Sequence, residues 1–195
     1  KPIPAAMWSR TAAIVIAAPI MVVAVIAVRL ETPGPVFFRQ YRLGRNGRPF
    51  LLYKIRSMTA SAPDIRDSLE DDNEASGPVF KIKADPRITR VGRVLRKYSI
   101  DEMPQLFHVL FGQMSLVGPR PPIPAEVERY EPWQTERLAV KPGLTCIWQV
   151  SGRSDIGFDE WIRMDIEYVR NRNLWLDIKL LLLTIPAVLT ARGAY

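Results

Sequence analysis

Two adjacent carboxylates, Asp101 and Glu102, are the residues of this chain best suited to do chemistry. They are the third and fourth residues of the stretch 99–122, SIDEMPQLFHVLFGQMSLVGPRPP. Ser99 and Glu102 have the spacing of a helix capping box. A cap at Asp101 would instead place Pro104 within the first helical turn, where proline is tolerated. Either register puts both carboxylates at the positive end of a helix dipole, which favours their ionised form. Capping accounts for one acid and leaves the other free.

Several arginines lie in turns or stiff segments near these acids. Prolines on both sides of Arg120, in Gly118-Pro-Arg-Pro-Pro122, fix the backbone, so the guanidinium has little conformational entropy left to lose. A phosphate-binding residue benefits from such rigid presentation. Arg153 lies on a second turn, and Arg96 lies five residues before Asp101. Each arginine alone is compatible with a structural role, but arginines that converge on the carboxylate pair would form a site for an anionic substrate.

Composition limits the classes of protein to consider. A chain of 195 residues with 48% hydrophobic residues suits one globular domain. The formal net charge is +7, and the 27 basic residues divide into 20 Arg and 7 Lys, which indicates phosphate chemistry, an anionic membrane or nucleic acid. Cys146 is the one cysteine, which excludes an internal disulfide, and the one histidine, His108, excludes a multi-histidine metal site. The sequence contains neither a P-loop nor a dinucleotide-binding fingerprint.

An uncharged segment, 11–28, lies between Arg10 and Arg29. As a helix it would be about 27 Å long, near the lower limit for crossing a bilayer core. Pro19, near its middle, is expected to bend it. Basic residues are more frequent after the segment than before it, which predicts a cytoplasmic location for the downstream side. Three arrangements remain open: a helix that crosses the membrane, a bent helix that enters and returns, and a buried core helix.

Periodicity and turn residues predict the elements that must position the acids and arginines. Asn46-Gly47, between strands at 36–43 and 50–57, indicates a β-hairpin with Lys54 and Arg56 on one face. Further strands are expected at 78–83 and 144–150, and helices at 88–98, 124–137 and 158–171, with a solvated acidic segment at 64–76. The apolar tail, 174–191, has no uncharged run long enough to span a bilayer and is expected to form an interfacial helix.

Five motifs occur in order along the chain: Thr32-Pro-Gly-Pro-Val-Phe-Phe-Arg-Gln40, Tyr53-Lys-Ile-Arg-Ser-Met58, Ser99-Ile-Asp-Glu-Met-Pro-Gln-Leu106, Met114-Ser-Leu-Val-Gly-Pro-Arg-Pro121 and Lys141-Pro-Gly-Leu144. Together they resemble the bacterial sugar transferases of the monotopic phosphoglycosyl transferase superfamily, and the resemblance runs from about Ala12 to the C-terminus. Such enzymes move a sugar-1-phosphate from a UDP-sugar to polyprenyl (undecaprenyl) phosphate and release UMP. They initiate the assembly of O-antigen, capsule, exopolysaccharide or other glycans.

The resemblance also implies roles for individual residues. Asp101 would be the nucleophile that forms a phosphosugar-aspartyl intermediate in a ping-pong mechanism, and Glu102 would assist it. Mg²⁺ would offset the charge of the diphosphate, with Asp101 and Asp177 as its acids, although Asp165 is a rival to Asp177. The positions that match the basic phosphate-binding residues of the family are Lys54, Arg96, Arg120 and Arg153. An ionised carboxylate is a usable nucleophile and leaving group toward phosphorus, so the implied chemistry is physically sound.

The resemblance implies an α+β catalytic domain, 33–195, on the cytoplasmic face of the bacterial inner membrane, after a re-entrant helix, 1–32. The helix would break at Ala18-Pro19, where the family often has Ser-Pro. The partners would be the UDP-sugar, polyprenyl phosphate and membrane lipids, with no nucleic acid, and self-association is left open. Because the chain begins at Lys1 rather than Met, we expect it to be the catalytic part of a longer protein.

Two other classes of function must be weighed against an enzyme. A membrane-anchored basic module that binds anionic lipid or nucleic acid would account for the charge but would leave the adjacent acids and the rigid Arg120 loop unexplained. Nucleic-acid binders also usually interleave aromatic and basic residues on one face, a pattern that is not evident here. A structural assembly factor predicts that substitution of Asp101 has no effect on function.

Overall fold

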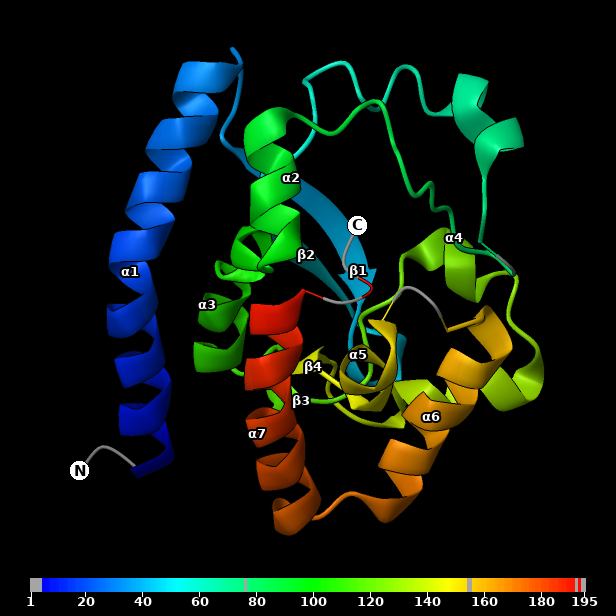
Figure 1. The fold of residues 1–195 in the computed structure, drawn as a ribbon. Helices are drawn as coiled ribbons and strands as arrows, with labels where there is room; N and C mark the ends of the chain where they lie inside the picture. Colours follow the sequence, from blue (N-terminus) through cyan, green and yellow to red (C-terminus); the bar gives the residue numbers. More distant parts are fainter. Residues whose placement is uncertain (1–4, 76, 154–155, 192, 194–195) are drawn as a thin grey trace.

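The computed structural model describes residues 5–75, 77–153, 156–191 and 193. The α-helices are α1 (Ala5–Glu31), α2 (Arg90–Lys97), α3 (Gln105–Leu110), α4 (Pro124–Val127), α5 (Ile147–Ser151), α6 (Phe158–Asn171) and α7 (Leu174–Thr190). The strands are β1 (Phe37–Leu43), β2 (Pro49–Ile55), β3 (Ser115–Val117) and β4 (Gly143–Thr145). The 3₁₀ helices are η1 (Arg45–Gly47), η2 (Asp67–Asp72), η3 (Ile100–Glu102) and η4 (Pro132–Ala139). The predicted α+β class is confirmed (Figure 1).

Helix α1 is continuous through Pro19, and Figure 1 shows it as one rod that does not reverse direction. The structure therefore shows no interruption of the helix at Ala18-Pro19, and the re-entrant arrangement in a membrane stays a prediction. A proline removes one backbone hydrogen bond and crowds the preceding turn, and here helical geometry continues on both sides of it. The part Ala13–Glu31 is long and apolar enough to cross a membrane, judged by length and composition. Lys1, on which the predicted topology also depends, lies outside the described residues.

The C-terminal half of α1 packs onto the rest of the protein. Ala24 and Val28 form a buried cluster with Ile55 of β2 and Leu95 of α2. At the end of α1, the Glu31 carboxylate accepts hydrogen bonds from the first turn of α2, at 3.1 and 3.2 Å from the backbone nitrogen of residue 91. An acid at a helix N-terminus satisfies free N–H groups and complements the helix dipole. Helix α1 therefore fixes the position of α2, which carries Arg96.

The β1–β2 hairpin is confirmed, with Phe37 opposite Ile55 and Leu43 opposite Pro49. Asn46 lies in the left-handed region at φ 58°, as expected for an Asn-Gly turn. The register places Gln40, Arg42 and Lys54 on one face of the hairpin, because side chains alternate along a strand. This face points toward the segment that contains Asp101 (residues 99–102 and their neighbours) through the contacts described below.

Helix α2, predicted at 88–98, is confirmed, and a glycine sets how closely it approaches β2. A Cβ at Gly92 would lie 1.9 Å from the Ser57 carbonyl oxygen, so only glycine fits there. Thr89 caps the helix by accepting from the Gly92 N–H at 2.9 Å. The close crossing brings the last turn of α2 to the end of β2, where the side chains of Arg96 and Ser57 meet.

The segment from Ser99 to Leu110 differs from the capped helix that its sequence predicts. Ser99 is in the left-handed region at φ 54°, and its side chain caps nothing. Asp101 and Glu102 lie in the 3₁₀ turn η3, and Pro104 occupies the N-cap position of α3. The missing N–H of Pro104 thus falls at a helix start, where it costs no hydrogen bond. The carboxylates precede the helix rather than standing in its first turn.

Three other predicted elements are wrong in extent or type. Residues 78–83 form no strand. The helix expected at 124–137 is divided into α4 and η4, because Pro132 cannot continue the first segment and begins the second. The strand expected at 144–150 ends at Thr145, where the chain turns into α5. Strand β4 pairs in parallel with β3, and Gly143 packs so closely on Gly118 that a Cβ there would lie 2.1 Å from the Gly118 nitrogen.

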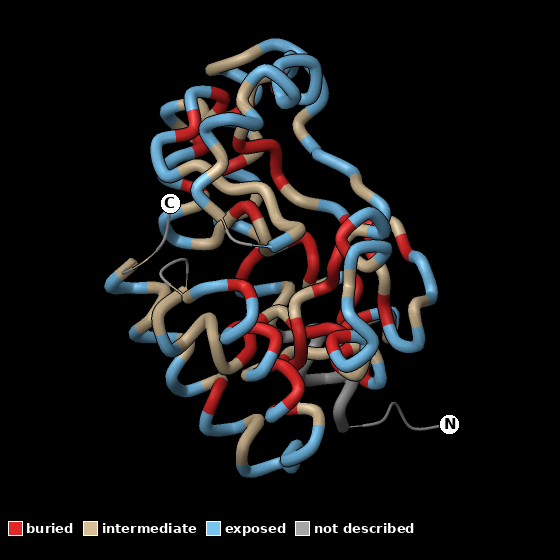
Figure 2. Tube along the Cα trace, turned by 90° about the vertical axis from the view of Figure 1, so that its right-hand side faces the viewer, coloured by how far each residue is buried: buried red, intermediate tan, exposed pale blue. Residues whose placement is uncertain are grey.

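The helices predicted at 158–171 and 174–191 are confirmed as α6 and α7. Tyr168 of α6 and Leu180 of α7 pack with Val117 of β3 in one buried cluster, which ties both helices to the parallel strands. Figure 2 shows that the buried positions gather inside the body of the molecule, while the acidic segment around η2 is largely exposed. The interfacial location predicted for α7 remains a prediction, although Trp175 and many of its apolar side chains are exposed.

Candidate active site

The two carboxylates predicted from the sequence lie in different surroundings. Asp101 is buried, with 6% of its surface exposed. Glu102 forms an ion pair with Lys54 of β2, with 2.5 Å between Oε1 and Nζ. Adjacent residues of a 3₁₀ turn point in different directions, so one carboxylate is neutralised by a direct partner and the other is not. The hairpin therefore delivers Lys54 to the acid pair, although 48 residues separate it from Glu102.

The different surroundings affect the two acids in opposite directions. Burial raises the pKa of Asp101 to about 6, the negative charge of Glu102 adds to this rise, and the charges of Lys54 and Arg96 oppose it. Burial also disfavours the charge of Glu102, but Lys54, through its charge and hydrogen bond, holds the pKa of Glu102 below its usual value. The expectation that both acids favour their ionised form is therefore confirmed for Glu102 and wrong for Asp101, since burial outweighs the nearby positive charges.

Arg96 and Arg153 both lie close to η3. The Arg96 Nε donates to the Ser57 hydroxyl at 2.9 Å, and its charge favours ionisation of Asp101. Arg153 Nη2 donates to the Ser99 hydroxyl at 3.4 Å, and Glu102 in turn favours the charge of Arg153. Both Ser99 and Arg153 are in the left-handed region, at φ 54° and 52°. Two unfavourable backbone conformations thus meet beside the acids, a feature common at functional sites.

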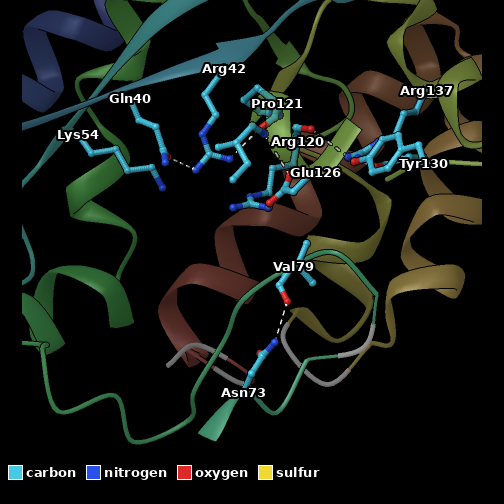
Figure 3. Close-up of polar contacts among 12 residues, drawn as sticks. Gln40, Arg42, Lys54, Asn73, Val79, Arg120, Pro121, Glu126, Tyr130 and Arg137 are labelled. Carbon is cyan, nitrogen blue, oxygen red and sulfur yellow. Dashed lines mark hydrogen bonds and ion pairs between the residues drawn. The ribbon is translucent and has the colours of Figure 1, made fainter. Parts of the chain in front are cut away.

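Arg120 projects from the rigid loop, residues 118–122, toward the same region. Its Nη1 lies 3.9 Å from Oε1 of Glu126, and its guanidinium lies 5.4 Å from the centre of the Trp161 ring. About a third of its side chain is exposed, and its charge lowers the pKa of Glu102. Figure 3 shows Arg120 beside Glu126, with Arg42 approaching from the hairpin. The structure therefore brings Lys54, Arg96, Arg120 and Arg153 to one acid pair.

Arg42 is a residue of this site that was not among the candidates predicted from the sequence. Its Nη2 donates to Gln40 Oε1 at 2.7 Å and its Nη1 to the Pro121 carbonyl at 3.0 Å (Figure 3). Burial, and then the charge of Arg120, lower the pKa of Arg42 to about 9. The alternation of β1 was the signal that could have found it, because Arg42 shares a face with Lys54 in the predicted hairpin.

The two candidates for an auxiliary acid have other partners. Asp177, in the first turn of α7, accepts a hydrogen bond from the Tyr168 hydroxyl at 2.8 Å. That turn lies at the lower end of α7 in Figure 1, away from the junction of α2 and α3 that holds η3. Asp165 is completely buried and pairs with Arg137 at 2.6 Å. The structure therefore does not bring either acid together with Asp101.

Asp101 and Glu102 are compatible with a metal site that is completed by the substrate. Among the described residues, no group of three or more His, Cys, Asp or Glu side chains could hold a metal ion. Of the two adjacent acids, Glu102 forms an ion pair with Lys54, whereas Asp101 has no ion-pair partner within the described part of the chain. Mg²⁺ commonly binds one or two protein carboxylates together with substrate phosphates and water. The residues fit such a shared site and do not fit a cage built by the protein alone.

The family model for bacterial sugar transferases matches residues 6–191 of this chain. This chain belongs to the bacterial sugar transferase family. The matched residues include nearly all of α1 and every residue placed in the candidate site above.

Named members of the bacterial sugar transferase family are similar to this chain over most of its length. The galactosyl transferase CpsE of Streptococcus agalactiae is 49% identical over 83% of this chain and 36% of its own length. An undecaprenyl-phosphate galactose phosphotransferase of Salmonella typhimurium is 45% identical over 93% of this chain and 39% of its own. A UDP-glucose:undecaprenyl-phosphate glucose-1-phosphate transferase of Caulobacter vibrioides is 41% identical, over 91% and 66%. The chain thus spans well under half the length of the first two curated relatives.

Proposed function

We propose that this chain catalyses transfer of a sugar-1-phosphate from a UDP-sugar to polyprenyl phosphate, with release of UMP. The observation that carries the proposal is the buried Asp101 beside the Lys54–Glu102 pair, with the charges of Arg96, Arg120 and Arg153 close enough to act on one or both acids. An excess of positive charge around a carboxylate suits a substrate that brings several negative charges. The substrates that the names of the Salmonella and Caulobacter relatives state have this character.

In the first step, an oxygen of ionised Asp101 attacks the phosphorus that bears the sugar. A bond forms between the carboxylate oxygen and phosphorus, and the bond from that phosphorus to the bridging oxygen of UMP breaks. Arg120 and Arg96 bind the phosphoryl oxygens, where planar guanidinium groups can donate two hydrogen bonds each. Glu102 holds Lys54 beside Asp101, so a positive charge lies where negative charge accumulates.

In the second step, a phosphate oxygen of polyprenyl phosphate attacks the same phosphorus, and the Asp101 oxygen leaves. The products are UMP and a polyprenyl diphosphate sugar, and the enzyme returns to its initial state. Mg²⁺, bound by Asp101 and substrate phosphates, would offset the charge of the diphosphate. Burial of Asp101 keeps the acyl phosphate away from water, which protects it from hydrolysis before the acceptor arrives.

The test is UMP release by the purified chain in lipid nanodiscs, with a panel of UDP-sugars. Sustained release should require Mg²⁺ and undecaprenyl phosphate. Without the acceptor, one equivalent of UMP should appear as a burst, together with the mass of a sugar phosphate on the intact protein. Steady release without a burst would contradict the covalent intermediate. Lipid binding with no UMP release for any sugar would contradict the proposed function and favour a membrane-anchored basic module.

We also propose that the site faces the cytoplasm at the bacterial inner membrane, anchored by α1. A cysteine placed at Arg48, in a background without Cys146, should react only with reagents that enter the cytoplasm. Reaction with a membrane-impermeant reagent added outside would contradict this location. A second cysteine at residue 2 then separates a crossing helix, labelled from outside, from one that returns, labelled from inside.

A further inference from the structure

Every backbone carbonyl from Pro119 to Pro122 accepts a hydrogen bond from elsewhere in the protein. The donors to the four carbonyls, in order, are the Gly143 N–H at 2.9 Å, Arg137 Nη2 at 2.9 Å, Arg42 Nη1 at 3.0 Å and the Leu43 N–H at 2.9 Å. Three of the four residues from Pro119 to Pro122 are prolines, whose φ is fixed by the ring. The backbone around Arg120 is therefore held by its own covalent geometry and by an outside donor at each peptide.

Two of the four donors are buried arginine side chains that approach the loop from different elements. Arg42 comes from β1 and Arg137 from η4 (Figure 3). The two bind successive carbonyls, those of Pro121 and of Arg120 itself. A hydrogen bond with a charged donor is stronger than a neutral one, and burial strengthens it further.

The two terminal nitrogens of the Arg137 guanidinium have charged and polar partners, whereas its Nε has no hydrogen-bond partner among the described residues. The guanidinium pairs with Asp165 at 2.6 Å, donates to the Tyr130 hydroxyl at 2.6 Å and lies 5.0 Å from the centre of the Trp161 ring. The same ring lies 5.4 Å from the guanidinium of Arg120. Arg137 therefore contacts both the backbone of Arg120 and the aromatic surface on which its side chain rests.

Arg42 differs, because its hydrogen-bond partners are neutral. Its guanidinium donates to an amide oxygen of Gln40 and to the Pro121 carbonyl, and it forms no ion pair with any described residue. The charge of Arg120 repels it, and the charges of Glu126 and Glu102 attract it from beyond ion-pair distance. Burial of a cation without an anionic partner lowers the stability of the folded protein. The position of Arg42 next to Arg120 is therefore better explained by a role in holding the loop, to which a negatively charged substrate would bind.

We propose that Arg42 and Arg137 are positioning residues, which hold the loop so that the Arg120 guanidinium is oriented to bind the substrate phosphate. The inference rests on the proposed transferase function and adds to it two residues that act through Arg120. Misplacement of a binding group by about 1 Å can reduce rate by roughly 100-fold. Loss of either donor should therefore act on turnover even though neither residue needs to touch the substrate.

A double-mutant cycle between Arg42→Lys and Arg120→Ala tests this assignment. Lysine keeps the charge but cannot reach Gln40 and Pro121 with a planar fork. Alone, Arg42→Lys should reduce kcat/KM for the UDP-sugar by about 10- to 100-fold, mainly through KM. In the Arg120→Ala background it should have no further effect, because the group that it positions is gone. Effects that multiply would overturn the assignment.

Arg87→Lys is the matched control. Arg87 forms a buried ion pair with Asp85 at 2.7 Å and has no contact with the loop. This variant loses buried arginine hydrogen bonds, as Arg42→Lys does, but should leave KM for the UDP-sugar unchanged. An equal rise in KM for Arg87→Lys and Arg42→Lys would reduce the Arg42 effect to general destabilisation and would overturn the proposal.

Hydrogen exchange provides a measurement that does not depend on activity. The Gly143 N–H donates to the Pro119 carbonyl, so its exchange rate reports how firmly the loop is held. In the full chain in nanodiscs, the rate should rise in Arg42→Lys and in Arg137→Lys but not in Arg87→Lys. Unchanged rates would overturn the positioning role. Absence of UMP release by the unmodified chain would overturn the transferase function instead, and the exchange rates would still decide the role of the two arginines.

Discussion

The ion pairs Arg137–Asp165 and Lys54–Glu102 lie on two sides of the same rigid loop and differ in how their charges are balanced. Arg137 and Asp165 are both fully buried, 2.6 Å apart, with Tyr130 as a further partner. Lys54 and Glu102 are 2.5 Å apart, but each keeps about a quarter of its side chain exposed, and Asp101, Arg96, Arg120 and Arg153 surround them. The first pair is a balanced charge within the protein, and the second is part of a region with excess positive charge.

This difference separates a structural use of charge from a functional one. A buried pair in which each charge has a direct partner of opposite sign gains little by comparison with apolar packing but is costly to break. An incomplete arrangement near the surface contributes little to stability and creates a field that favours a negatively charged ligand. We therefore expect substitutions of Arg137 and Asp165 to lower stability strongly, in addition to the effect of Arg137 on the Arg120 loop, and substitutions around Asp101 to act mainly on turnover.

The largest effect is expected for Asp101→Asn, which removes the attacking oxygen. Turnover should fall by roughly 10³-fold or more, since a covalent route loses its nucleophile. UMP release by purified protein measures it, and Asp159→Asn, at an exposed acid in the first turn of α6, is the matched control. Glu102→Gln should also be severe but should still accumulate the sugar phosphate on the intact protein. Near-normal turnover of Asp101→Asn would show that another residue is the nucleophile.

Arg137→Met tests the balanced side of the comparison. It leaves Asp165 buried without its cation, so the free energy of unfolding should fall by about 3–5 kcal/mol. Replacing both residues, as in Arg137→Met with Asp165→Leu, should restore part of this loss. Thermal unfolding of the detergent-solubilised chain measures both.

Lys54→Met is the counterpart on the unbalanced side. Because this pair is partly exposed, its loss should cost no more than about 1 kcal/mol of stability, while turnover falls strongly. If Lys54→Met destabilised the fold as much as Arg137→Met, the distinction between the two pairs would be lost.

Arg120→Lys should reduce turnover by about 10- to 100-fold, because lysine keeps the charge but lacks the planar fork that binds two phosphate oxygens. Arg66→Lys is the control at an arginine outside the site, whose guanidinium lies over the Phe80 ring. Steady-state kinetics with the UDP-sugar compares the two. Equal effects at both positions would assign Arg120 a structural role alone.

The smallest effect is expected in the dependence of turnover on pH. Because burial raises the pKa of Asp101 to about 6, kcat/KM should fall as the pH drops through this value and the nucleophile gains a proton. The charge of Glu102 contributes to the raised pKa, so Glu102→Gln should move the fall to lower pH. A profile that stays flat between pH 5 and 8 would argue against Asp101 as the ionised nucleophile, and Glu160→Gln, an exposed acid of α6, should leave the profile unchanged.

The sequence alone determined the elements whose signals are local. The Asn46-Gly47 turn, the amphipathic helix that became α2, and α6 follow from turn chemistry and periodicity, which neighbouring residues decide. The acid pair and the rigidity of the Arg120 loop could also be identified, because adjacent acids and flanking prolines are local features of the amino-acid sequence. The predicted hairpin, which carries Lys54, is confirmed.

Only the tertiary structure decided how these pieces meet. Burial of Asp101, and with it the direction of its pKa, depends on how α2, β2 and η3 pack, which no local pattern contains. The pairing of Asp165 with Arg137 and the hydrogen bond from Tyr168 to Asp177 are contacts that the sequence does not show, and the role of either residue as an auxiliary acid stays a prediction. Arg42 became part of the site because a strand placed it against a loop 79 residues away. Charges act through space, so their effect on one another is set by the fold and not by their order along the chain.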